Sequence, residues 1–499
     1  MRRIGALLSL AALGACSLEP PYQRPQGAVP PSWPTGDAYP RPDEAALPSV
    51  SYRDIFKDPR LQAVIAQALD ANQDLRAALA NVASARAQYR VAHAAIFPAI
   101  DGTGRVSIEN GSDRGGSNNI GSGTGTGSSG SSGSNSGGTS RSYSLELGTT
   151  SFEIDLFGRL RSLSHAAFDE YLGTEAAARA TRLTLVAEVA NAWLQLAADR
   201  SLLAVSNATE ASALKSVDLT RARLQGGIAP RTDLRQAETI LAQARSDQAQ
   251  LITAVAQDRN ALDLLAGAPV ADAQLPESLE SVDGLLGELP AGLDSGILLR
   301  RPDVVQTEYQ LRAANARIGA ARAAFFPRVA LTALAGVAST ALSSLFTGGA
   351  FTWSVQPSAT LPIFDAGANR GNLHYAEAQR DLAVADYRKA IQTAFREVSD
   401  ALARRGTIDR QLAADRQLEE AARDSLFLGT ARYREGIDTY LATLDAQRTL
   451  YAAQRTLATT RLVRAQNLVA LYQTLGGDAL VDALPVPGRG AEAAISPPP

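Results

Sequence analysis

Few residues of this chain are suited to chemistry. Its three histidines, His93, His165 and His374, lie in helical segments or at helix starts, and no metal-ligand spacing connects them. Glycines are numerous, but none of the glycine-rich segments matches the loop that cradles a phosphate after a strand. We therefore predict no catalytic residue, no metal site and no cofactor. The function must therefore be inferred from the helices and strands that the sequence predicts, not from reactive side chains.

The first residues indicate export from the cytoplasm. Two arginines precede an apolar run at residues 4–15, which is the pattern of a secretory signal. The run ends with small residues before Cys16, the only cysteine, and this resembles the cleavage box of bacterial lipoproteins. We predict a signal peptide at 1–15 and a lipid on Cys16, and Ser17 favours sorting to the outer membrane. The alternative is an ordinary signal peptide, or a short membrane anchor, with an incidental cysteine.

Composition excludes several partners. The formal net charge is -3 and no block of lysine and arginine occurs, so nucleic acid is not an expected partner. No stretch of about 18 apolar residues follows the signal, so we expect no transmembrane helix. A single lipid group anchors only reversibly. If the chain also enters the outer membrane, it must do so as part of a β-barrel.

The chain repeats itself. Phe97-Pro98 matches Phe326-Pro327 at an offset of 326 - 97 = 229 residues. Further on, Gly227-Ile228 matches Gly436-Ile437 at an offset of 436 - 227 = 209 residues. The difference falls largely in a Gly/Ser tract of the first copy, at 110–140. We predict two structural repeats, each with a helix, two strands and two further helices.

Long helices dominate each predicted repeat. Proline is absent from 99–229 and from 363–484, where helices are needed. A continuous helix over 160–224 would be about 100 Å long at about 1.5 Å per residue. Apolar residues such as Val189 and Trp193 recur at helical spacing, which predicts coiled-coil packing. A simple filamentous coiled coil would show the same pattern.

Alternating segments argue against a purely filamentous protein. Apolar and polar residues alternate in the first copy and in the second, at 143–147, 152–156, 329–333, 351–355 and 361–363. We expect four strands per chain, which are too few to close a membrane barrel, so several chains must combine. Two small soluble hairpins are the alternative.

The Gly/Ser tract at 110–140 has three interpretations: an interdomain linker, a flexible hairpin loop, or an insertion with its own role. Strand-like sequence flanks the tract on both sides, and the repeat places it inside one unit. We therefore favour the hairpin loop.

An ordered set of motifs resembles the TolC-like outer-membrane factors of efflux systems, in their NodT-type lipoprotein branch. The similarity covers about 52–477, and no single motif decides it. The motifs are Asp155-Leu-Phe-Gly-Arg159, Arg300-Arg-Pro-Asp-Val304, residues 313–327, Leu361-Pro-Ile-Phe-Asp-Ala-Gly367, residues 432–441 and Ala446-Gln447-Arg448.

The resemblance implies a mainly α fold with a membrane β-barrel. Three chains would close a twelve-stranded barrel in the outer membrane and a long α-helical coiled-coil barrel in the periplasm. The expected divisions are a signal peptide at 1–15, a lipidated extended segment at 16–60, one efflux repeat at 61–267, an equatorial connection at 268–292, a second repeat at 293–477 and a tail at 478–499.

The resemblance also implies a gate at the periplasmic tip. Leu441 and Asp445 match the apolar and acidic residues that form rings in the closed channel, and Tyr433 and Arg448 match residues that tie inner to outer helices. Three carboxylates in a narrow bore would attract cations, while leucine would block the bore sterically. The alternative for Asp445 is a solvated residue paired with Arg448 at i, i+3.

These features lead to one favoured hypothesis and two alternatives. The favoured one is a homotrimeric channel that works with a periplasmic adaptor and an inner-membrane pump and passively exports small toxic compounds. The first alternative is a conduit for secreted proteins. The second is a lipid-anchored periplasmic coiled-coil adaptor without a pore.

Overall fold

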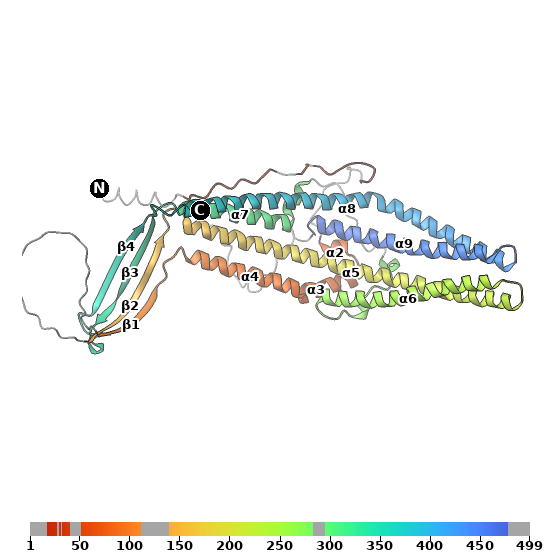
Figure 1. Cartoon of the computed structure of the whole chain (residues 1–499), viewed down its shortest axis with the longest axis horizontal. Coiled ribbons are helices and arrows are strands. Elements are labelled where there is room, and N and C mark those ends of the chain that lie inside the picture. Colours follow the sequence, from red (N-terminus) through yellow and green to blue (C-terminus); the bar gives the residue numbers. More distant parts are fainter. Residues whose placement is uncertain are drawn as a thin grey trace, which may run out of the picture. The chain divides into compact units, whose positions relative to one another are not determined.

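The computed structural model describes residues 17–26, 29–30, 32–39, 51–110, 139–282 and 295–477. Its element order confirms the two predicted repeats, because one helix, two strands and two long helices occur twice (Figure 1). The first repeat contains α4 (Gln73–Ala94), β1 (Asp101–Asn110), β2 (Thr139–Ile154), α5 (Arg159–Gln225) and α6 (Arg231–Ala266). The second contains α7 (Pro302–Ala323), β3 (Arg328–Ser339), β4 (Phe351–Thr360), α8 (Ala368–Arg434) and α9 (Tyr440–Thr474).

Shorter elements accompany the repeats. Helices α2 (Tyr52–Ile55) and α3 (Pro59–Ala71) precede the first repeat, so the segment expected to be extended over 16–60 already contains helix at its end. Short 3-10 helices among the described residues are η2 (Asp272–Gln274), η3 (Glu280–Val282), η4 (Ser295–Arg300) and η5 (Leu342–Ser344). The predicted signal peptide, Cys16 and the tail at 478–499 lie outside the described residues.

The chain forms two compact units, which are described separately. Unit 1 comprises 1–22, 87–168 and 313–379 and contains the sheet. Unit 2 comprises 23–86, 169–312 and 380–499 and contains α6, α9 and most of α5 and α8.

Long helices form where the sequence predicted them. Helix α5 runs over 67 residues and α8 over the same number, and α5 extends the predicted 160–224 by one residue at each end. Trp193, from the predicted apolar stripe, is fully buried, and its indole Nε1 donates a hydrogen bond to the carbonyl oxygen of Gln274 at 3.0 Å. Within the described ranges, no helix combines the length and apolar character needed to cross a membrane.

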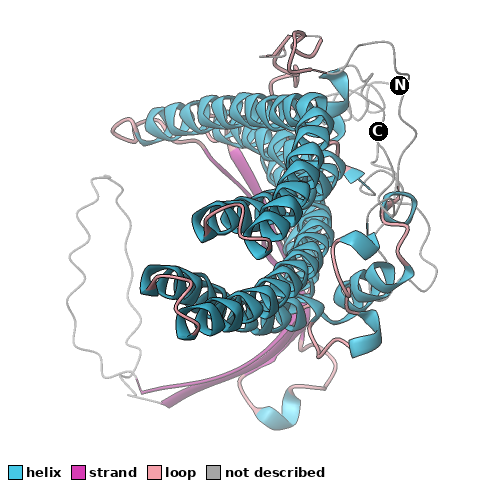
Figure 2. Cartoon of the chain, turned by 90° about the vertical axis from the view of Figure 1, so that its right-hand side faces the viewer, coloured by secondary structure: helices cyan, strands magenta, loops and turns pink. Residues whose placement is uncertain are grey.

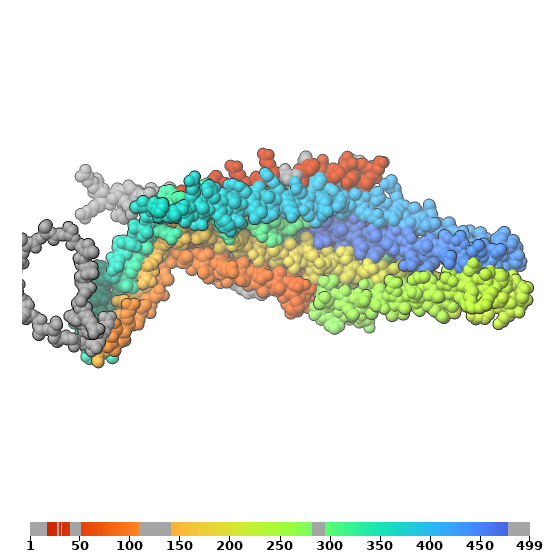
Figure 3. Space-filling view, viewed as in Figure 1, coloured from red at the N-terminus to blue at the C-terminus, as the bar shows by residue number. Residues whose placement is uncertain are grey.

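Two helical hairpins dominate unit 2. Helices α5 and α6 form helical hairpin 1, and α8 and α9 form helical hairpin 2, each closed by a short turn (Figure 2). In the space-filling view, α6 and α9 lie side by side (Figure 3), and the two helices are in direct contact. The candidate site is built from these two turns.

Unit 1 contains one antiparallel sheet in the order β1-β2-β3-β4. Leu147, Ala335 and Trp353 are paired across β2, β3 and β4, so they share one face. Trp353 is 70% exposed and Leu147 is 63% exposed. Glu146 and Thr352 lie in the neighbouring row, on the opposite face. One face of the sheet is therefore apolar and uncovered in the single chain.

The strands differ from the sequence prediction in two places. The segments at 143–147 and 152–154 belong to one strand, β2, which continues through a register shift between Thr149 and Phe152, with Ser151 at φ 60°. Residues 155–156 follow the end of this strand. Residues 361–363 lie beyond the end of β4 and are not in a strand. Most of the Gly/Ser tract lies outside the described residues, but its flanking strands pair through Asn110 and Thr139.

An extended N-terminal segment lies against the helices of unit 2. We call its described residues, 23–26, 29–30 and 32–39, the strap. The guanidinium of Arg24 donates to both carboxylate oxygens of Glu308, each at 2.9 Å from Nη2. The rings of Trp33 and Phe395 stack at 5.1 Å between centroids. These contacts lie on α7 and α8, far along the chain from the strap.

One pair of carboxyl groups in unit 2 predicts a pH-dependent stability. Burial raises the pKa of Asp258 on α6 to about 7, and the hydrogen bond and the charge of Asp199 on α5 add to the shift. Asn467, which corresponds to Asp258 at 258 + 209, is a buried neutral amide that donates to the carbonyl oxygen of Ala401. The second repeat thus carries the uncharged counterpart of a protonated aspartic acid.

We expect the free energy of unfolding to fall as the pH rises from about 4 to about 7, because the native state then holds a proton that the unfolded chain, with an ordinary pKa of 3.8, has released. Each pH unit in this window contributes at most about 1.4 kcal/mol. Asp258→Asn should remove most of this fall, as measured by thermal unfolding between pH 5 and pH 8. Asp218→Asn, at an exposed position of α5, is the control. Parallel pH profiles for the wild type and Asp258→Asn would contradict the assignment.

Candidate functional site at the two helical turns

The two helical turns have the same backbone geometry. Gly227 has φ 73° and Gly436 has φ 75°, a conformation that glycine adopts without strain. In turn 1 the Ile228 amide donates to the carbonyl oxygen of Arg223 at 3.0 Å, and in turn 2 the Ile437 amide donates to that of Arg432 at 2.9 Å. Each helix therefore ends with the same capping bonds, 209 residues apart.

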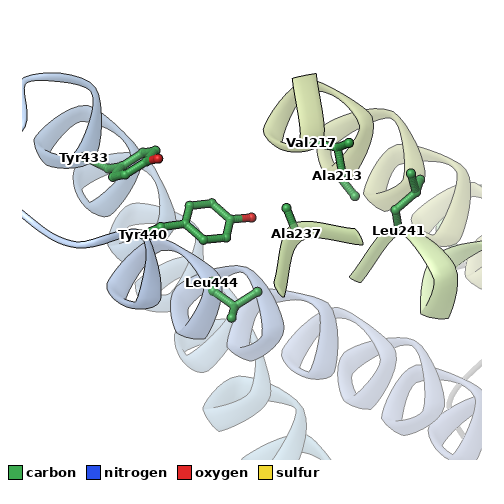
Figure 4. Close-up of a cluster of buried hydrophobic side chains, with 7 residues drawn as sticks. All are labelled: Ala213, Val217, Ala237, Leu241, Tyr433, Tyr440 and Leu444. Carbon is green, nitrogen blue, oxygen red and sulfur yellow. The ribbon is translucent and has the colours of Figure 1, made fainter. Parts of the chain in front are cut away.

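A buried cluster joins the two helical hairpins beside these turns (Figure 4). Its members are Ala213 and Val217 of α5, Ala237 and Leu241 of α6, Tyr433 of α8, and Tyr440 and Leu444 of α9. The rings of Tyr433 and Tyr440 meet edge to face at 5.3 Å between centroids. Figure 4 shows that the Tyr440 ring extends toward Ala237 of the other helical hairpin. Aromatic side chains of hairpin 2 thus pack against small and aliphatic side chains of hairpin 1.

Two equivalent arginines make different contacts. Arg432 forms a bidentate ion pair with Asp438 in its own turn, at 2.5 and 3.0 Å. The position equivalent to Asp438 in turn 1 is 438 - 209 = 229, which is Ala229. Arg223 instead crosses to hairpin 2, where it donates to the carbonyl oxygen of Tyr433 at 2.8 Å and lies 4.5 Å from the centre of the Tyr433 ring. Arg432 therefore stabilises its own turn, whereas its equivalent in the first repeat, Arg223, connects the two helical hairpins.

Charge and burial are distributed unevenly around the turns. The hydrogen bond and charge of Arg432 lower the pKa of the partly exposed Asp438 carboxyl. Burial raises the pKa of Asp233 in hairpin 1, and the charge of Arg223 partly offsets this. Burial also raises the pKa of Tyr433 and of Tyr440. Both tyrosine hydroxyls are buried without a hydrogen-bond partner among the described residues, which is unfavourable for this packing.

The structure separates the four residues expected at the gate. Tyr433 is buried in the cluster, whereas Leu441, Asp445 and Arg448 are exposed on α9. Their spacing of four and three residues places these three on one helix face. Arg448 makes no ion pair with Asp445 or any other described residue, so the alternative considered for Asp445, a pair with Arg448 at i, i+3, is not formed. This exposed face of α9 is the candidate gate face.

Sequence reasoning missed Arg223 and Tyr440, although both lie at the interface between the helical hairpins. The offset of 209 residues aligns Arg223 with Arg432, and the missing acid at Ala229 is the signal that Arg223 has another partner. Nothing in the local pattern around Tyr440 distinguishes it from an ordinary residue at a helix start.

The histidines occupy separate places. His93 Nδ1 lies 3.2 Å from the Ser164 hydroxyl oxygen, and His165 Nδ1 lies 3.3 Å from Oε2 of Glu19. His374 Nδ1 lies 3.4 Å from Oε2 of Glu377. In the part of the chain that the structure describes, no three His, Cys, Asp or Glu side chains are grouped as metal ligands would be.

Comparison with known proteins gives the family. The sequence profile described as outer membrane efflux protein matches residues 64–268 and 294–477. The toluene efflux pump outer membrane protein TtgC of Pseudomonas putida is 44% identical over 482 residues, covering 95% of each chain. The solvent efflux pump outer membrane protein SrpC of Pseudomonas putida is 42% identical over 479 residues, covering 94% of this chain and 97% of SrpC.

A solved structure agrees with this result. The open state of the MtrE outer membrane channel of Neisseria gonorrhoeae superimposes with a TM-score of 0.79 at 32% identity, covering 93% of this chain and 98% of MtrE. The matches span both repeats, and so include the sheet as well as the helical turns. The chain belongs to the outer membrane efflux protein family.

Proposed function

We propose that this protein is the outer-membrane channel subunit of a tripartite efflux system. It passively passes small toxic compounds, received from an inner-membrane pump through a periplasmic adaptor, to the outside of the cell. The family match over both repeats carries this proposal. The relatives named for solvent and toluene efflux support a substrate class of small apolar compounds, and they favour neither protein secretion nor an adaptor without a pore.

The sheet supports insertion into the outer membrane. Its exposed apolar face includes Leu145, Leu147, Phe351 and Trp353, from strands β2 and β4. Large exposed apolar patches on a protein mark contact with another protein or with lipid. Three copies of the four-stranded sheet would give a closed set of twelve strands with this face toward lipid.

The helical turns support a gate. In a homotrimer, three copies of the α9 face would place three Leu441 and three Asp445 side chains around a common axis. Tyr433, held by Arg223, ties hairpin 2 to hairpin 1 within one chain. Arg448 has no partner among the described residues of its own chain, and we assign it a tethering contact with a neighbouring chain.

The function is tested by deleting the gene and measuring susceptibility to a panel of organic solvents and antibiotics. We expect the deletion strain to become sensitive to several compounds and the wild-type gene to restore resistance. The reciprocal test expresses this protein in a strain whose own outer-membrane efflux channel has been deleted, and measures whether resistance to the same panel returns. Unchanged susceptibility across the panel, with the pump and adaptor expressed, would contradict the efflux function.

The same strains test the lipid on Cys16. Cys16→Ala should abolish incorporation of labelled palmitate. It should reduce resistance only in part if the sheet itself holds the trimer in the membrane. Ser17→Ala retains the cysteine and is the control for processing of the signal peptide.

A further inference from the structure

A buried carboxylate links the two helical hairpins well away from their turns. Asp247 of α6 is 9% exposed. Its Oδ2 accepts a hydrogen bond from the Tyr451 hydroxyl at 2.6 Å and lies 3.5 Å from Nη1 of Arg455. Both of these partners belong to α9. Its Oδ1 accepts from the side-chain amide of Gln243 at 2.8 Å. Both oxygens of this carboxylate are therefore used, and two of the three partners come from the other hairpin.

The contacts inside each helical hairpin are of a different kind. In hairpin 1, Arg245 pairs with Glu210 at 2.9 Å. In hairpin 2, Arg464 pairs with Asp409 at 2.8 Å. Such contacts join the two helices of one hairpin, so each hairpin can move as a rigid body. Asp247, by contrast, joins hairpin 1 to hairpin 2.

The position of Asp247 separates its role from that of the turn cluster. Tyr451 follows Tyr440 by 451 - 440 = 11 residues, which is about 16 Å along the helix. The cluster around Tyr433 and Tyr440 can therefore separate while the contact at Asp247 stays closed. Hairpins that part at their turns would pivot about this point.

Some buried polar atoms between the turn cluster and Asp247 lack hydrogen bonds in the described part of the chain. Gln447 lies one turn from Tyr451 and from Leu444, is 4% exposed, and has neither side-chain amide atom hydrogen-bonded within the described residues. Water that entered as the hairpins parted would hydrate this amide and the hydroxyls of Tyr433 and Tyr440. These unpaired polar atoms lower the free-energy cost of parting the hairpins near the turns.

We propose that Asp247, Tyr451 and Arg455 form a latch between α6 and α9 that limits how far the two helical hairpins part. Burial, together with the hydrogen bond to Asp247, raises the pKa of Tyr451, so its hydroxyl stays protonated and donates to the carboxylate. Arg455 supplies the positive charge that a buried carboxylate requires. Together these contacts set the resting width of the conduit, a role that rests on the proposed channel function.

The latch is tested with Asp247→Asn, which keeps the shape of the side chain, and with Tyr451→Phe, which removes only the hydroxyl. Losing a charge-assisted hydrogen bond should raise the ratio of parted to closed hairpins about ten-fold, equivalent to about 1.4 kcal/mol. Both variants should then show a larger mean current than the wild type in planar bilayers. Arg245→Ala breaks an arginine–carboxylate contact that lies inside hairpin 1 and should leave the current unchanged.

A distance measurement separates the latch from the channel function. Spin labels are placed at the exposed positions of Ala249→Cys and Ala452→Cys in a Cys16→Ala background, and labelled chains are diluted with unlabelled ones in the trimer. We expect longer and broader label distances in Asp247→Asn and Tyr451→Phe, with unchanged helix content. If the wild type conducts and both variants match it in current and distance, the latch is overturned and the channel stands. If no trimer conducts, the distances alone decide: longer distances support the latch and unchanged ones overturn it.

Discussion

Replacing Leu441 and Asp445 together by alanine is expected to raise the conductance of the trimer in planar bilayers several-fold. Both side chains are exposed on one face of α9, close to turn 2. If three copies of this face surround the conduit, the double substitution removes three apolar side chains that narrow it and three carboxylates that hold cations there. Asp445→Asn alone should change cation selectivity more than conductance, because it removes the charge and keeps the size.

A matched control comes from α8. Asp424 and Leu428 are both exposed and stand four residues apart, as Leu441 and Asp445 do. The double alanine variant at these positions should conduct as the wild type does. Equal conductance of the wild type and the α9 double variant would remove Leu441 and Asp445 from the gate, whatever the control shows.

Arg301→Ala is expected to lower the free energy of unfolding by about 3 kcal/mol, since it removes a nearly buried guanidinium that several groups share. The Arg301 side chain is only 10% exposed. It donates to both carboxylate oxygens of Asp303 at 3.0 and 2.7 Å, to Glu397 of α8 at 2.9 Å, and to the carbonyl oxygen of Thr474 at the end of α9 at 3.0 Å. One side chain therefore holds the start of α7, the middle of α8 and the end of α9.

The test compares denaturant unfolding of Arg301→Ala with that of Arg300→Ala. Arg300 is the exposed neighbour, and its removal should change the unfolding free energy by no more than about 0.5 kcal/mol. Arg301→Lys should fall between the wild type and Arg301→Ala, because an ammonium group keeps the charge but cannot reach all three partners in a planar fork. Equal loss of stability in both alanine variants would contradict the assigned role.

The long helices could be predicted closely because their signals are local. The absence of proline and the apolar spacing around Trp193 are properties of neighbouring residues, and α5 ends within one residue of the expected limits. The motif at 300–304 was recognised as a family feature, but its physical reason needed the structure. Arg301 meets Glu397 and Thr474, which lie 96 and 173 residues away.

The strands and the site could be predicted only in part. The alternation of apolar and polar residues located β2. It did not show that 143–147 and 152–154 form one strand, because the register shift at Ser151 does not affect the hydrophobic pattern. Leu441, Asp445 and Arg448 could be placed on one helix face from their spacing alone. The contact between Asp247 and Tyr451 joins residues 204 apart, and periodicity within one helix carries no information about such a contact.

The strap has a consequence for the order of folding. Arg24 meets Glu308, which lies 284 residues later, and the carbonyl oxygen of Asp37 accepts from Arg410, which lies 373 residues later. The residues that are synthesised and exported first therefore have no docking site until most of the second repeat has emerged and folded. A docked strap is thus a sign that the second repeat has folded. Docking of the N-terminal strap therefore depends on folding of the second repeat.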